Sequence, residues 1–123
     1  MFAGMGAALP FIKAEKLRAL GVAGAKRSVV MPDLPMIGEY LKGYEASTWF
    51  GMFAPAGTPN QIITKLNADV MKVMARSDVE GQLLAQGYET LTSTPEELGI
   101  YVKSEIAKWS KVIRDANIPK QGS

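Results

Sequence analysis

The side chains that most often do catalytic chemistry are missing from this sequence or stand where helices are expected to begin. It contains no histidine and no cysteine, so a Ser-His-Asp triad, a Cys-His pair and a thiolate metal site are all excluded. Zinc would have to bind through carboxylates alone, which is uncommon in proteins. We therefore predict no catalytic residue, no metal site and no cofactor.

The charged residues offer few candidates for chemistry. Asp33 and Glu39 could share a cation, but no neighbouring residue fixes their geometry. Lys26 and Arg27 could attract an acidic ligand, although an exposed loop is the ordinary place for such a pair. The remaining acids of interest fall in the first turns of expected helices, and we interpret them as caps rather than as catalysts: Glu80, Glu96 and Glu97.

The start of the chain offers a backbone site instead of a side-chain site. Residues 2–6, FAGMG, place small residues before an expected helix, without the spacing or the lysine of a phosphate loop. Small residues at a helix start let backbone N–H groups approach an anion. A tight strand-to-helix turn without a ligand is the more ordinary explanation of these residues.

Composition predicts an ordinary soluble domain. The 123 residues are 47% hydrophobic and 21% charged, and 14 basic residues against 12 acidic ones give a net charge of +2. Because these charges form no dense basic block, we expect no nucleic-acid partner. No apolar run approaches the roughly 20 residues of a membrane helix, and the first residues carry no export signal.

The pattern of apolar residues predicts an α/β chain. Expected strands are 17–24, 46–54 and 88–92, of which 46–54 is the strongest because it is rich in aromatic and β-branched residues. A short helix is expected over 7–16, with Pro10 tolerated in its first turn. Pro32 and Pro35 predict a loop that includes one helical turn near 36–40.

Three helix starts share one capping pattern, in which a hydroxyl residue is followed three positions later by an acidic or amide side chain. They begin at Thr58, Ser77 and Thr94, and predict helices over 59–75, 78–86 and 95–117. Gly87 suits a left-handed cap after the second of these helices. The aromatic residues Trp49, Phe50 and Trp109 are expected in the core.

Several segments in a fixed order resemble one receptor family. They are ALPFIKAEKLRALGV (8–22), AKRS (25–28), PDLPMIGE (32–39), GYEASTWFGMFAPAGTP (43–59) and TPEELGIYVKSEIAKWSKVIRDANI (94–118). Together they resemble the C-terminal portion of the Bug family, the extracytoplasmic solute receptors of tripartite tricarboxylate transporters. Each motif alone is weak, but the ordered set covers nearly the whole chain.

The resemblance implies part of a two-lobed periplasmic-binding-protein fold of type II. Residues 1–47 would form the end of the second lobe, and residues 48–123 the crossing strand and the C-terminal part of the first lobe. In the family, backbone groups hold the ligand carboxylate, and the matching turn here is Phe2, Ala3 and Gly4. Family members often carry aspartate in place of Ala3 and glycine in place of Glu15, and the first difference bears on recognition of an amino or hydroxyl group.

The same resemblance implies a function. The chain, or the protein of which it is a piece, would bind a small organic carboxylate outside the cytoplasmic membrane and present it to the membrane components of a transporter. Because half-lobes expose strand edges, we also expect a homo-oligomer or a domain-swapped assembly. The alternative is a truncated orphan domain that has lost solute binding and acts as an assembly or interaction module. A small hydrolase is a distant third, since no nucleophile stands with a base.

Overall fold

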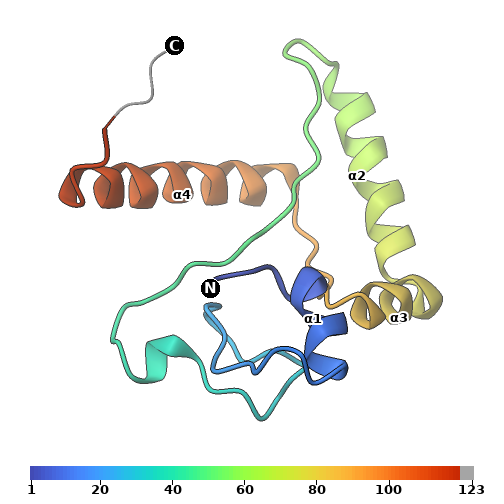
Figure 1. Cartoon of the computed structure of the whole chain (residues 1–123). Coiled ribbons are helices and arrows are strands. Elements are labelled where there is room, and N and C mark those ends of the chain that lie inside the picture. Colours follow the sequence, from blue (N-terminus) through green and yellow to red (C-terminus); the bar gives the residue numbers. More distant parts are fainter. Residues whose placement is uncertain (120–123) are drawn as a thin grey trace. The chain divides into compact units, whose positions relative to one another are not determined.

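The computed structural model describes residues 1–119, and within them the regular elements are helical (Figure 1). The elements are α1 (Met5–Lys13), the 3-10 turn η1 (Ile37–Glu39), α2 (Asn60–Met74), α3 (Ser77–Ala85) and α4 (Pro95–Asp115). They belong to two compact units. The first combines Met1–Phe53 with Ala68–Thr92, and the second combines Ala54–Asn67 with the chain from Ser93 onward.

Helix α1 begins earlier than the sequence predicted, and its proline lies in the interior. Pro10 is the sixth residue of Met5–Lys13, so the expectation that it would lie in the first turn is wrong. Proline has no N–H group, so the helix lacks one interior hydrogen bond at this point. The helix then ends through Glu15, which takes a left-handed conformation with φ of 56°. Glycine adopts this conformation with less strain, and it is the residue expected here from the family resemblance.

The predicted strands do not form in the described residues. Residues 1–119 contain one β-bridge, a parallel one between Val22 and Met36. In it, Val22 N donates to Pro35 O and Ile37 N donates to Val22 O, each at 2.9 Å. Segments 46–54 and 88–92 join no ladder within residues 1–119. A strand depends on a neighbour at hydrogen-bonding distance, so residues with high β-propensity do not make one alone.

Only one of the three predicted capping boxes has the expected geometry. At α4, Thr94 Oγ1 accepts from Glu97 N at 3.2 Å, and Glu97 Oε2 accepts from Thr94 N at 2.8 Å. At α2, the Thr58 hydroxyl instead donates to Pro55 O at 2.8 Å. At α3, Arg76 is the cap residue and Ser77 is already helical, so the predicted Ser77 cap is wrong. The helices nevertheless begin within one residue of the predicted positions.

Burial is sparse in the part of the chain that the structure describes. Among residues 1–119, the buried apolar residue is Leu9 and the buried charged residue is Glu105. Trp109 Nε1 donates to Glu105 Oε2 at 3.0 Å, and Lys108 Nζ pairs with the same carboxylate. The Trp109 side chain is nevertheless 40% exposed, and Phe50 is 79% exposed, so the prediction that they lie in the core is wrong for both.

Candidate functional site

The three predicted ligand-binding residues lie directly before α1. Gly4 is the N-cap residue, with extended backbone (φ −62°, ψ 141°) and no side chain to cap the helix. Its carbonyl accepts from the N–H groups of Ala7 and Ala8, each at 3.1 Å. The N–H groups of Met5 and Gly6 are therefore the first-turn donors without an acceptor inside the helix. Such donors, with the positive end of the helix dipole, favour an anion in front of the helix.

The first turn of α1 is held in place by a close contact with the turn after α3. A Cβ atom on Gly6 would lie 2.6 Å from Gln86 O and 2.9 Å from Tyr88 Cζ. Gly87, with φ of 80°, also comes close, because a Cβ on it would lie 3.0 Å from Gly6 N. The sequence indicated Gly87 only as a helix cap. The structure shows a second role, in which two glycines let the backbones of two segments meet.

The surface in front of this helix start is open. Phe2 is 79% exposed, and no atom other than those of Gly4 and its chain neighbours lies within 4 Å of where a Cβ on Gly4 would stand. None of the three predicted residues carries a charge, so any binding here depends on backbone donors. Such an arrangement can hold an anion, but it offers no group for acid-base or nucleophilic catalysis.

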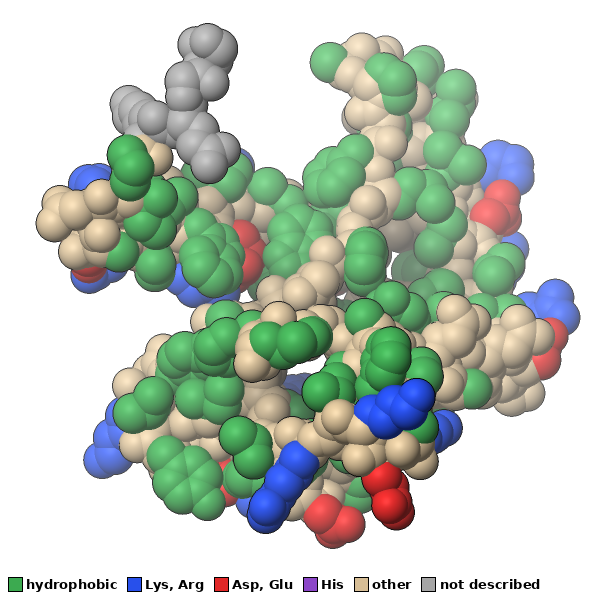
Figure 2. Space-filling model, in the orientation of Figure 1, with side chains coloured by type: hydrophobic (Ala, Val, Ile, Leu, Met, Phe, Trp, Pro, Cys, Tyr) green, Lys and Arg blue, Asp and Glu red, His purple; other side chains and the backbone are tan. Residues whose placement is uncertain are grey.

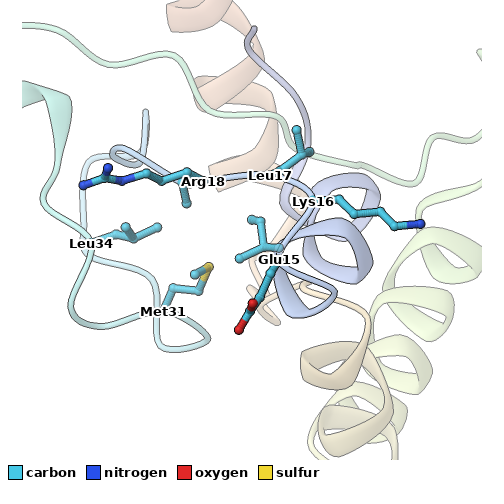
Figure 3. A pocket seen from close by; sticks show the side chains of 8 residues that line it. Glu15, Lys16, Leu17, Arg18, Met31 and Leu34 are labelled. Atoms are coloured by element: carbon cyan, nitrogen blue, oxygen red, sulfur yellow. The ribbon is translucent and has the colours of Figure 1, made fainter.

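A cavity of about 550 Å³ lies at the other end of α1 (Figure 3). Glu15, Arg18, Met31 and Leu34 surround it, whereas Lys16 points away from the hollow. Since α1 has nine residues, this cavity is about 13 Å along the helix from its N-terminus. Phe2, Ala3 and Gly4 do not line it. A smaller cavity of about 290 Å³ is lined by residues between Met71 and Thr92, including Glu80.

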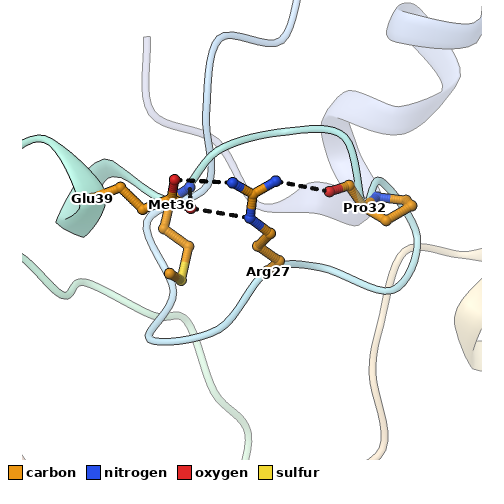
Figure 4. Close-up of polar contacts among 4 residues, drawn as sticks. All are labelled: Arg27, Pro32, Met36 and Glu39. Carbon is orange, nitrogen blue, oxygen red and sulfur yellow. Dashed lines mark hydrogen bonds and ion pairs between the residues drawn. The ribbon is translucent and has the colours of Figure 1, made fainter.

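Glu39 forms an ion pair that the sequence did not reveal (Figure 4). Arg27 donates to both of its carboxylate oxygens, at 3.0 and 2.9 Å, and reaches Pro32 O at 3.4 Å. Met36 N also donates to Glu39 Oε1, at 3.1 Å. The backbone donor first, and Arg27 second, lower the pKa of Glu39 below its ordinary value. A cation shared by Asp33 and Glu39, which the residue pattern did not favour, finds no support in the structure, because Arg27 already pairs with Glu39; no metal-ligating cluster occurs in the described residues.

A second polar contact joins this loop to the segment that follows α3. Glu89 Oε1 accepts from Ser28 Oγ at 2.8 Å and from Val29 N at 2.9 Å. The contact spans 61 positions, and no local pattern indicates it. Together with the Arg27–Glu39 pair, it fixes both ends of the loop that carries Pro32 and Pro35. These polar groups serve the fold rather than a reaction.

Comparison with known families gives a match along nearly the whole chain. The family model "Tripartite tricarboxylate transporter family receptor" matches residues 1–118. A UPF0065 protein of Pseudomonas sp. is 41% identical over 104 residues, which cover 83% of this chain and 31% of the relative. Protein BugT of Bordetella pertussis is 33% identical over 114 residues, covering 90% of this chain and 34% of BugT. The chain thus spans about a third of the length of these relatives.

Solved structures show the same fold. An R. palustris protein with adipate superposes with a TM-score of 0.80 at 35% identity, and covers 92% of this chain and 38% of that one. The periplasmic binding protein BugD gives a TM-score of 0.79 at 32% identity, and the match covers 93% of this chain and 39% of BugD. MatC from Rhodopseudomonas palustris with bound malate gives 0.71 at 36% identity, with coverage of 89% and 38%. The predicted fold class, part of a two-lobed periplasmic binding protein, is confirmed, although the individual strands are not formed.

Proposed function

Because this chain belongs to the tripartite tricarboxylate transporter receptor family, we propose that it contributes the N-terminal turn of α1 to a binding site for a small organic carboxylate. The family consists of solute receptors rather than enzymes, in agreement with the prediction made from the sequence. The observation that carries the proposal is the exposed helix start after Phe2, Ala3 and Gly4, where Met5 and Gly6 present free backbone donors.

The chemistry of this helix start suits a carboxylate. Two adjacent N–H groups can donate to the two oxygens of one carboxylate, and the helix dipole adds a favourable field. Two structural neighbours were solved with adipate and malate, which are both dicarboxylates. Since Ala3 stands where relatives often carry aspartate, we propose a ligand whose affinity does not depend on an amino or hydroxyl group at that position.

We further propose that the protein works with the membrane components of a tripartite transporter in the periplasm. The family description and the periplasmic neighbours support this proposal. In residues 1–119, no helix is both long enough and apolar enough to cross a membrane.

Self-association is a separate proposal, and the exposed segment 46–54 supports it. Phe50, Met52 and Phe53 are each at least 66% exposed. Their backbone joins no ladder in the described residues, so a strand from another copy could pair with it. We expect a mass above that of a monomer in light scattering; a monodisperse monomer across working concentrations would contradict this proposal.

A direct test of the carboxylate site removes one donor and keeps the helix. Met5 is the first residue of α1, where proline is tolerated, and Gly4 has the extended backbone that a following proline requires. We expect Met5→Pro to weaken binding of adipate or malate by at least about 10-fold in calorimetric titration, since a hydrogen bond to a charged group is lost. Met5→Ala is the matched control, because it removes the same side chain and retains the N–H group.

The outcomes of this test separate the candidate functions. Equal affinity of Met5→Pro and Met5→Ala would place the carboxylate elsewhere. Silence of the unmodified chain across a panel of mono-, di- and tricarboxylates would favour the alternative, an assembly module that has lost solute binding.

A further inference from the structure

We draw no further inference here: the strongest candidate, the exposed apolar face of α4 (Figure 2) that includes Ile106, Trp109 and Ile113, carries nothing, because the chain spans about a third of the length of its relatives and nothing in the structure shows what covers this face.

Discussion

Replacing Gly6 with alanine tests whether the first turn of α1 is held as the structure shows. The added Cβ would lie 2.6 Å from Gln86 O and 2.9 Å from Tyr88 Cζ, closer than carbon atoms approach such neighbours. One of these neighbours is a backbone atom, which cannot rotate away. We expect a steric cost of about 1–3 kcal/mol in the free energy of unfolding, as for other overpacked sites.

The magnitude is best measured against Gly81→Ala. Gly81 lies inside α3, and outside the backbone of its own helix and its chain neighbours no atom is within 4 Å of the position that a Cβ on it would occupy. Both variants gain up to about 1 kcal/mol of helix propensity, so this gain largely cancels in the difference between them. Gly81→Ala should stabilise the protein, whereas Gly6→Ala should be about 1–3 kcal/mol less stable than Gly81→Ala.

Urea unfolding followed by far-UV circular dichroism measures both free energies of unfolding. A difference below about 0.5 kcal/mol would refute the close contact between α1 and the turn after α3. It would also remove the reason to regard the donors of Met5 and Gly6 as fixed in place. A large difference between the two variants, with the same dependence of the free energy of unfolding on urea concentration, would support the close contact and the fixed position of these donors.

Two further predictions concern a helix cap and an ion pair. Thr94→Ala should lower the free energy of unfolding by about 1 kcal/mol in urea unfolding, because it removes a real cap. Ser77→Ala should change the free energy of unfolding by less than about 0.5 kcal/mol, since Ser77 does not cap α3. If Ser77→Ala and Thr94→Ala lowered the free energy of unfolding equally, Ser77 would act as the cap that the sequence predicted. The lowered pKa of Glu39 contributes stability that is present at neutral pH and is lost as pH falls through that pKa. Thermal unfolding of Glu39→Gln should therefore depend less on acid pH than that of the unmodified protein, and identical pH profiles would contradict this expectation.

The helices could be predicted from the sequence because their signals are local. Capping residues, proline at a first position and apolar stripes predicted α2, α3 and α4 to within about two residues at either end. Gly87 and the turn η1 were predicted for the same reason. The choice among caps was less predictable. Thr58 and Thr94 both precede proline, yet the Thr58 hydroxyl donates to Pro55 O, whereas the Thr94 hydroxyl accepts from Glu97 N. The direction of each bond depends on the path of the backbone before the helix.

The strands and the polar contacts could not be predicted, because they depend on distant partners. Segment 46–54 has strong β-propensity, but pairing needs a second strand, and propensity does not supply one. The Ser28–Glu89 contact joins residues 61 positions apart, and the Arg27–Glu39 pair joins residues 12 apart. Because neither contact has a local signal, the residues alone indicated no partner for Glu39 and solvent for Arg27.

The helix start at the candidate carboxylate site could be predicted from the sequence, whereas the contact that holds it could not, and the binding of a carboxylate there stays a prediction. Small residues at 2–4 indicated a turn before a helix, and α1 does begin directly after Gly4. No pattern in the sequence indicates that Gly6 and Gly87 pack against each other and so hold this helix start. This contact would favour the proposed carboxylate binding, since donors that are already positioned need not be ordered when a ligand binds. A carboxylate held by neutral backbone donors also leaves no buried ion pair to break on release. The proposed site would suit a receptor that releases its solute unchanged, since its residues offer no group that would convert the solute into a product.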